Sequence, residues 1–285
     1  MFSKPKYLNF KGKLLDLSIP RIMGVINITP DSFYKGSRAV TEKEIIDTAV
    51  RMNREGADIL DVGGYSSRPH AEDVPEEVER ERVLHAVRLI ADKLPEAIIS
   101  VDTFRAKIAE EAVKDCGAHM VNDISGGSLD EKMFEVISEL DVPYIIMHMK
   151  GTPKTMQDNP EYEDVVAEIL TWFGSRIVRL RSLGVKDIII DPGFGFGKTI
   201  IHNFELLQHL NDFAVAGLPV MVGVSRKSMI WKTLGIKPDD ALNGTSVLHT
   251  IALLKGADIL RVHDVKEARE AILLVQQMKG KEVIT

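Results

Sequence analysis

Polar side chains stand at the ends of the short apolar segments that recur along this chain. Eight such segments are closed, in order, by Asn27, Asp61, Asp102, Asn122, His148, Asp191, Gly223 and His263. A single Asp or Asn in such a place is a helix cap or a turn residue about as often as it is a functional residue. Seven polar or ionisable residues out of eight are harder to explain in that way, because Ser, Thr and Gly would serve equally well in turns. We therefore interpret these positions as parts of one chemical site.

The side chains at these positions predict the kind of molecule that the site binds. A carboxylate accepts hydrogen bonds from ring N–H and amino groups, and a carboxamide offers both a donor and an acceptor. A lysine such as Lys227 donates to a carbonyl or a ring nitrogen. Together these groups suit a flat heterocycle with an amide-like edge. Such a pocket rejects analogues that lack the edge, since its buried polar groups are then left unpaired.

A second group of residues suits an anion and a divalent metal ion. Asn27, Arg261 and His263 belong to the first and last apolar segments, which become neighbours if the segments close into a barrel. Mg²⁺ keeps most of its waters and takes few protein ligands, so one contact from Asn27 is expected rather than a full protein cage. The alternative for "RVHD" (261–264) is a plain strand end followed by a helix cap at Asp264. The eight histidines include no HExxH or His-x-His pair, which argues against zinc.

Three loops that follow the apolar segments carry further polar groups. They are "GGYSSRP" (63–69), the glycine-rich "DPGFGFGKT" (191–199) and "GVSRKSMI" (223–230), in which a helix is expected to start near Ser228. The glycine-rich loop matches neither a P-loop nor a dinucleotide fingerprint. We expect its glycines to let an aromatic side chain fold over a flat ligand. His148, between two methionines, is expected to be packed or hydrogen-bonded rather than a metal ligand.

Apolar segments alternate with amphipathic ones almost to the end of the chain, and this alternation predicts an α/β fold. The expected strands are 22–26, 57–62, 98–101, 118–121, 143–147, 187–190, 219–222 and 259–262. The expected helices are 42–55, 76–93, 106–115, 131–140, 165–183, 241–255 and 266–278. Eight strands with continuous Val, Ile and Leu runs predict a (β/α)₈ TIM barrel, in which the carboxyl ends of all strands meet at one rim. An open doubly wound sheet is the alternative.

Length and composition limit the class of protein. The 285 residues are expected to form a single domain, with residues 1–20 as an N-terminal extension or hairpin across the barrel floor. A net charge of −6 argues against non-specific nucleic-acid binding. The single cysteine excludes an internal disulfide, and no apolar run is long enough to cross a membrane. We therefore expect a soluble, cytoplasmic protein.

Eight sequence blocks together resemble the bacterial dihydropteroate synthases of the pterin-binding family. They are "NITPDSF", "GADILDVGGYSSRP", "SVDTF", "VNDISGG", "MHMKGTP", "DPGFGFGKT", "VSRKS" and "RVHD", in this order between residues 22 and 271. The resemblance implies a (β/α)₈ barrel, a homodimer and a role in folate biosynthesis. It further implies that dihydropterin pyrophosphate (6-hydroxymethyl-7,8-dihydropterin pyrophosphate) and p-aminobenzoate condense to 7,8-dihydropteroate and pyrophosphate, with help from Mg²⁺. The implied route is a dissociative substitution at the pterin CH₂, and sulfonamides are the implied competitive inhibitors.

The resemblance also implies roles for individual residues. The pterin pocket is implied to contain Asp102, Asn122, Asp191 and Lys227, with Asp191 facing the 2-amino and ring N–H edge. The pyrophosphate site is implied to contain Asn27, Arg68, Arg261 and His263, with Asn27 also bound to Mg²⁺. The p-aminobenzoate site is implied to contain Phe33, Ser67, Arg68, Pro69, Phe196, Lys227 and Ser228. Asp102, Lys227, Arg261 and His263 are the implied catalytic residues.

Two features depart from the family pattern, and two other functions compete with it. The family often has Thr followed by Pro-Gly where this chain has Ser67, Pro69 and His70, which predicts altered p-aminobenzoate and sulfonamide affinity.

A pterin-binding methyltransferase shares the barrel but is expected to lack the Arg261 and His263 pair and the "SRKS" block. A non-catalytic pterin-binding relative is the other alternative, and the intact set of polar residues argues against it.

Overall fold

Eight parallel strands surround a common axis in the computed structural model, which describes residues 7–10, 12–28, 38–65 and 74–280, without the side chains of 38–41. The strands are β3 (Arg21–Asn27), β4 (Ile59–Gly63), β5 (Ile98–Asp102), β6 (Met120–Asp123), β7 (Tyr144–Met147), β8 (Ile188–Asp191), β9 (Met221–Val222) and β10 (Ile259–Val262). Their order is β8-β7-β6-β5-β4-β3-β10-β9, and a parallel bridge between Ile190 and Val220 joins the two edges. The predicted barrel is confirmed, and the open-sheet alternative is wrong.

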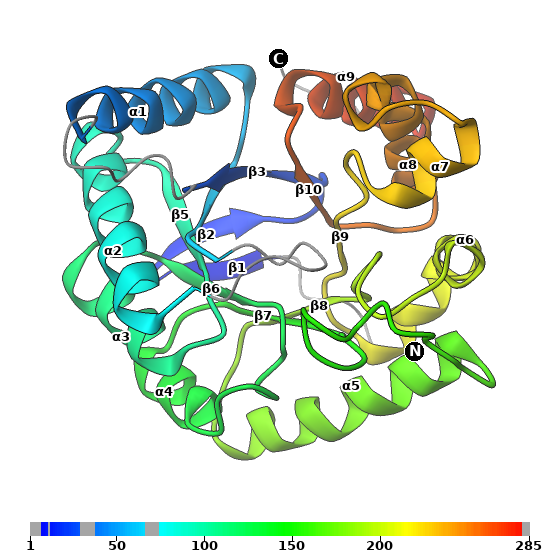
Figure 1. The fold of residues 1–285 in the computed structure, drawn as a ribbon, viewed down its shortest axis with the longest axis horizontal. Helices are drawn as coiled ribbons and strands as arrows, with labels where there is room; N and C mark the ends of the chain where they lie inside the picture. Colours follow the sequence, from blue (N-terminus) through cyan, green and yellow to red (C-terminus); the bar gives the residue numbers. More distant parts are fainter. Residues whose placement is uncertain (1–6, 11, 29–37, 66–73, 281–285) are drawn as a thin grey trace.

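Helices cover the outside of this barrel on all sides (Figure 1). They are α1 (Arg38–Glu55), α2 (Glu76–Lys93), α3 (Ala106–Asp115), α4 (Met133–Leu140), α5 (Val165–Ser182), α6 (Ile200–Gln208), α7 (Ser228–Leu234), α8 (Leu242–Leu254) and α9 (Val265–Met278), with short 3₁₀ helices η2 (Leu210–Ala216) and η3 (Pro238–Asp240). All seven of the helices predicted with both bounds are present, α2 and α3 with the predicted ends. Within the described ranges, no helix is both long and apolar enough to span a bilayer.

Helix α6 is absent from the sequence prediction, for a reason that lies in its side chains. Asn203 is 2% exposed, whereas Ile201 is 76% exposed, so the polar and apolar positions are exchanged relative to an ordinary amphipathic helix. The buried Asn203 carboxamide accepts a hydrogen bond from Gly195 N (2.7 Å) and donates one to Thr199 O (2.7 Å). This helix therefore supports the glycine-rich loop rather than only the core.

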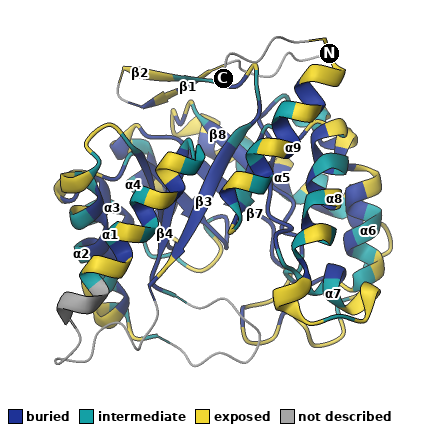
Figure 2. Cartoon of the chain, turned by 90° about the horizontal axis from the view of Figure 1, so that it is seen from above, coloured by how far each residue is buried: buried dark blue, intermediate teal, exposed yellow. Residues whose placement is uncertain are grey.

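An N-terminal hairpin closes one end of the barrel, as predicted. Strands β1 (Tyr7–Phe10) and β2 (Lys13–Asp16) pair antiparallel and lie across that end (Figure 2). Leu8, Phe10 and Leu17 pack on one apolar side chain from each barrel strand: Met23, Ile59, Ile98, Met120, Ile145, Ile189, Met221 and Ile259. These eleven residues form the barrel floor.

The next inward-facing layer of the barrel is polar. Side chains alternate between the two faces of a strand, so the residues two positions beyond the floor face the same interior. They are Val25, Asp61, Ser100, Asn122, Met147, Asp191, Gly223 and Arg261. Asp61 was expected at the end of a strand, but β4 continues to Gly63, and Asp61 pairs with Val25 and Ser100 inside the sheet. The chemistry thus begins within the barrel, beneath its rim.

The separation of floor and rim predicts that stability and activity respond differently to a floor substitution. Phe10 is 3% exposed in the floor, so Phe10→Ala is expected to lower the free energy of unfolding by about 3 kcal/mol in urea titrations. Its kcat/KM should stay unchanged, because the floor layer separates the hairpin from the polar layer. Leu14→Ala, at a residue of the same hairpin that is 61% exposed, is the matched control and should change neither quantity. An unchanged unfolding midpoint for Phe10→Ala would contradict the floor assignment.

Candidate active site

Arg261 of β10 joins carboxylates from two other strands inside the barrel. Its Nε donates to Asp61 Oδ2 (2.7 Å) and its Nη2 donates to Asp102 Oδ2 (2.5 Å). Asn122 of β6 donates through Nδ2 to the same Asp61 Oδ2 (3.0 Å). One network therefore links β4, β5, β6 and β10. The structure brings the predicted residues Asp102, Asn122 and Arg261 together through Asp61, which the sequence included among the site positions but gave no individual role.

In this network, burial disfavours the charged forms of Asp102 and Arg261, whereas their mutual attraction favours them. Burial raises the pKa of Asp102 to about 7, with further contributions from the charges of Asp61 and Glu79, although Arg261 pulls it down. Burial also works against the Arg261 guanidinium, but Asp61 and Asp102 outweigh it and the pKa of Arg261 is raised. Arg261 is therefore a permanent cation, whereas Asp102 changes charge near neutral pH.

Lys227 and Asp191 form a second charged group beside the network. Lys227 Nζ donates to the carbonyl of Phe194 and lies 4.8 Å from the centre of the Phe196 ring. Burial lowers the pKa of Lys227 to about 8, against the pull of Asp191. Burial likewise raises the pKa of Asp191, against the pull of Lys227. The pair offers one acceptor and one donor side by side, as a flat polar heterocycle requires.

The glycine-rich loop is held in place by polar contacts from below. Asp191 Oδ1 accepts from Gly193 N (2.8 Å), and buried Lys198 donates to the carbonyls of Gly193 (3.0 Å) and Phe196 (2.9 Å). Phe194 is fully buried in the core, so its side chain does not fold over a ligand, whereas Phe196 lies at the rim next to Lys227. The expectation of a covering aromatic thus applies to Phe196 alone.

His148 is a structural residue, as expected. Its ring is 5% exposed, lies edge-on to Trp172, and its Nδ1 contacts Lys198 Nζ (3.0 Å). Burial, together with the charge of Lys198, lowers the pKa of His148 to about 2. The imidazole is therefore neutral and accepts the lysine's hydrogen bond, which fixes the base of the loop.

At the rim, the "RVHD" segment combines a ligand position with a structural one. His263 is exposed, and its Nδ1 and backbone N–H both contact Ser225 Oγ (3.1 and 3.2 Å). Asp264 precedes α9 but makes no side-chain cap bond, because its carboxylate pairs with Nε and Nη2 of Arg226 at 2.9 Å each. Asp264 therefore occupies the N-cap position of α9, as the alternative expected, but its carboxylate bonds to Arg226 and does not cap the helix. Ser225 and Arg226 thus hold His263 and Asp264 in place at the rim. The sequence pattern placed both residues in the 223–230 loop but did not predict these contacts.

The remaining predicted residues are distributed between the rim and the residues that the structure does not describe. Asn27 is exposed at the end of β3, and Ser228 begins α7 as expected. Phe33, Ser67, Arg68, Pro69 and His70 lie outside the described residues. Among the described side chains, no three of His, Cys, Asp or Glu come together as a metal site.

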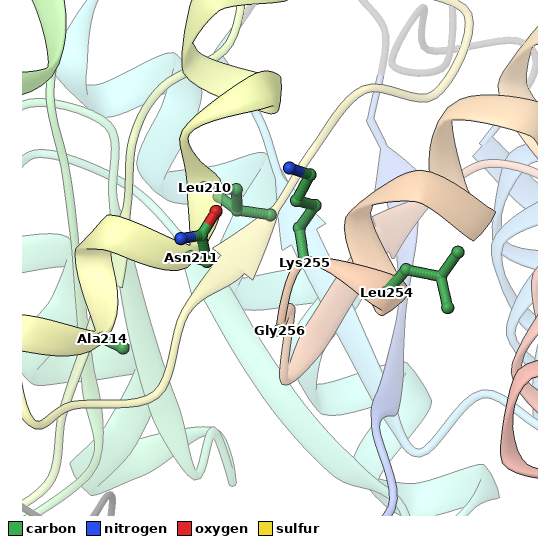
Figure 3. A pocket seen from close by; sticks show the side chains of 6 residues that line it. All are labelled: Leu210, Asn211, Ala214, Leu254, Lys255 and Gly256. Carbon is green, nitrogen blue, oxygen red and sulfur yellow. The ribbon is translucent and has the colours of Figure 1, made fainter. Parts of the chain in front are cut away.

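A hollow of about 590 Å³ lies on the outside of the barrel, away from this chemistry (Figure 3). It is lined by Leu210, Asn211, Ala214, Leu254, Lys255 and Gly256. The last three come a few residues before β10, so they lie towards the amino end of that strand, and none of the six belongs to the charged network. We therefore place the active site at the opposite, carboxyl end of the strands, where catalytic residues of such barrels lie.

Comparison with known proteins agrees with this geometry. A family model described as "Pterin binding enzyme" matches residues 23–263. The dihydropteroate synthase of Escherichia coli K12 is 44% identical over 93% of this chain and 94% of its own length. The chain belongs to the dihydropteroate synthase family. It is an enzyme of folate biosynthesis, and the expected family, fold and activity are confirmed.

Solved structures of the family superpose closely on nearly all of the chain. The Yersinia pestis dihydropteroate synthase, in complex with a sulfonamide drug, gives a TM-score of 0.89 at 39% identity and covers 96% of this chain and 99% of its own. The Xanthomonas albilineans dihydropteroate synthase with 4-aminobenzoic acid gives a TM-score of 0.88 at 36% identity, with coverage of 97% and 99%. The methyltransferase and non-catalytic alternatives therefore give way to the synthase.

The geometry of the glycine-rich loop predicts a strong response to one methyl group. Gly193 has φ +72°, and a Cβ there would lie 2.0 Å from His148 O. Gly193→Ala is expected to lower the free energy of unfolding by about 2–4 kcal/mol and to reduce turnover, because the loop must shift away from His148 and its bonds to Asp191 and Lys227 are then disturbed.

Gly235→Ala is the control for the backbone conformation alone. Gly235 has a similar φ of +66°, and no described atom lies within 4 Å of the place that a Cβ would take, so about 1 kcal/mol is expected. Equal losses in the two variants, measured by chemical denaturation, would show that the contact with His148 O is unimportant.

Proposed function

We propose that this enzyme joins dihydropterin pyrophosphate to p-aminobenzoate by a dissociative substitution at the pterin CH₂. The observation that carries the proposal is the network in which Arg261 is shared by Asp61 and Asp102, close to the Asp191 and Lys227 pair. Acceptors for a heterocycle and a cation for a leaving group thus converge in one interior layer. The proposal further includes a single domain over residues 1–285, a homodimer and a cytoplasmic location.

The pterin is proposed to bind in the buried part of this layer. The Asp191 carboxylate accepts from the 2-amino and ring N–H edge, and Lys227 donates to a ring nitrogen or carbonyl. Asn122 is 2% exposed and Asp191 is 3% exposed, so a ligand that leaves either unpaired is rejected. Asp102 lies beside the reacting end of the ring, where its ionised form stabilises positive charge.

The leaving group is proposed to bind at the outer side of the same layer, on Arg261, His263, Asn27 and Arg68. Arg261 supplies a permanent positive charge, and His263 supplies a hydrogen-bond donor at the rim. The exposed Asn27 carboxamide offers a donor oxygen there, and it fits Mg²⁺ because this ion retains most of its water and needs few protein ligands. When bound, Mg²⁺ supplies charge neutralisation to the diphosphate.

The aromatic amine is proposed to bind between the rim and α7. Phe196 and Lys227 lie together there, and Ser228 provides the first N–H of the helix for the substrate carboxylate. Phe33, Ser67, Arg68 and Pro69 are proposed to complete this site, which sulfonamides would share as competitors of p-aminobenzoate. The Xanthomonas albilineans and Yersinia pestis relatives hold 4-aminobenzoic acid and a sulfonamide drug, which supports this part of the proposal.

The reaction needs no strong base. The C–O bond to pyrophosphate breaks first, and both electrons leave with the phosphate oxygen while the ring and CH₂ become cationic. The neutral amine of p-aminobenzoate then forms the C–N bond and loses a proton to solvent. The residues therefore act on charge: Arg261 and His263 on the departing anion, and Asp102 on the cation.

The pH dependence of kcat/KM for the pterin substrate is predicted to be bell-shaped. Asp102 must be ionised to stabilise the cation, so activity falls as the pH drops through about 7, the pKa of Asp102. Lys227 must be protonated to act as a cationic donor, so activity falls as the pH rises through about 8, the pKa of Lys227. Lys227→Gln is expected to remove the basic limb and keep the acid limb. A basic limb that persists in this variant would assign it to another group.

Pyrophosphate release from the two substrates with Mg²⁺ tests the function directly. The wild-type chain is expected to release one pyrophosphate for each 7,8-dihydropteroate formed. Asp191→Asn is expected to lower kcat/KM for the pterin substrate about 100-fold or more, because an amide N–H then faces the ring donors. Asp187→Asn is the matched control. It also replaces a carboxylate by an amide, at the residue just before β8 and at the opposite end of that strand from Asp191, and it should leave turnover unchanged. Absence of release by the wild-type chain would refute the proposed function.

A further inference from the structure

Asp61 is a fully buried carboxylate in the middle of β4, and the proposed reaction gives it no direct part. Its side chain is 0% exposed, and one oxygen, Oδ2, accepts both from Arg261 Nε (2.7 Å) and from Asn122 Nδ2 (3.0 Å). These two partners are proposed to bind different halves of the pterin substrate. Asn122 contacts the ring, and Arg261 contacts the diphosphate.

The second oxygen of Asp61 destabilises the fold rather than stabilising it. Oδ1 is buried and has no hydrogen-bond partner among the described residues, and the same holds for the hydroxyl of Ser100, its neighbour in the register. An unpaired buried acceptor destabilises a folded protein, and apolar side chains in place of the whole buried pair would avoid that loss. The presence of Asp61 is therefore better explained by what it holds than by stability.

The two carboxylates that share Arg261 differ in depth. The Asp61 side chain is 0% exposed, that of Asp102 is 18% exposed, and that of Arg261 is 23% exposed. An entering ligand can reach Asp102 and the outer edge of the guanidinium, but it cannot reach Asp61. Separation of Arg261 from Asp61 would leave a fully buried charge unpaired, whereas Asp102 can be rehydrated or paired with a ligand.

We propose that Asp61 is the positioning residue of this active site. It anchors Arg261 through Nε and Asn122 through its amide, while Asp102 releases Arg261 to the incoming diphosphate and turns to the pterin ring. Asp61 touches neither substrate and acts only through these two side chains. The inference rests on the proposed function, because it assigns Arg261 and Asn122 to the two halves of one substrate.

Two substitutions at this position separate the anchor from its charge. Asp61→Ala removes both hydrogen bonds, and kcat/KM for the pterin substrate is expected to fall about 100-fold, as is usual when reacting groups are displaced by about 1 Å. Asp61→Asn keeps one carbonyl oxygen for both donors, so its loss is expected to be only about 10-fold. The KM for p-aminobenzoate should stay within about twofold in both variants, because that substrate does not contact Arg261 or Asn122.

The pH profile of Asp61→Asn gives a readout that a merely structural role would not move. The groups that act on Asp102 are Arg261, which favours its ionised form, and the carboxylates of Asp61, Glu79 and Asp123, which oppose it. Removal of the Asp61 charge makes Asp102 easier to ionise, so the acid limb should move to lower pH. Asp123→Asn is the matched control. Asp123 is a buried carboxylate whose charge also opposes ionisation of Asp102, but its side chain bonds to Tyr144 Oη (2.7 Å) and Gly127 N (2.7 Å) rather than to Arg261 or Asn122. Asp123→Asn should therefore lower stability and move the acid limb the same way, while kcat/KM for the pterin substrate on the plateau above that limb stays within about twofold of wild type.

A thermal-unfolding cycle tests the anchor without turnover. The Tm changes of Asp61→Ala and Arg261→Met should be clearly non-additive in the double variant, since each removes the same ion pair. Additive changes, an Asp61→Ala enzyme within threefold of wild-type kcat/KM, or an unmoved acid limb in Asp61→Asn would each overturn the inference. A wild-type chain that makes no 7,8-dihydropteroate would instead refute the proposed function, and the unfolding cycle would still decide the anchor.

Discussion

One guanidinium group, that of Arg261, organises the interior of this barrel. It is shared by Asp61 and Asp102, and Asp61 in turn holds Asn122, so side chains from four strands are fixed by a single cation. In a region of low dielectric these contacts are strong, and each partner would be destabilising without the others. The arrangement gives the site rigidity at its base and a replaceable partner, Asp102, at its open side. A reaction that creates a cation and releases an anion needs both properties.

The glycine-rich loop serves the same site through its backbone. The side chain of Phe194 packs in the core, and the backbone carbonyl of Phe194 accepts a hydrogen bond from Lys227 Nζ. The reactive lysine is therefore bound by the main chain of the loop. Lys198, Asn203 and His148 hold the loop from beneath through hydrogen bonds. The low pKa of Lys227 follows from the same burial. The conformation of the loop and the lowered pKa of Lys227 thus both follow from the same packing.

The fold was predictable because its signals are periodic, and the parts that were not predictable lack periodicity. Continuous apolar strands and amphipathic helices indicated the barrel, its hairpin and most bounds. Helix α6 was missed because Asn203 is buried while Ile201 is exposed. Asp61 was grouped with the residues that close the strands, and only the register shows that it lies within β4 and faces inward with Ser100 and Val25. The pairing of Arg226 with Asp264 joins residues 38 positions apart and carries no local signal.

The barrel floor has a consequence for the order in which the chain can fold. The hairpin residues Leu8 and Phe10 are translated before any barrel strand, but their apolar partners extend to Ile259 on β10. The floor can close only after nearly all of the chain has been synthesised, so these side chains lack part of their native surroundings until then. Contacts of such long sequence separation slow folding and leave apolar surface open to aggregation. The hairpin that completes the native barrel therefore carries apolar side chains that lack their native partners until late in synthesis.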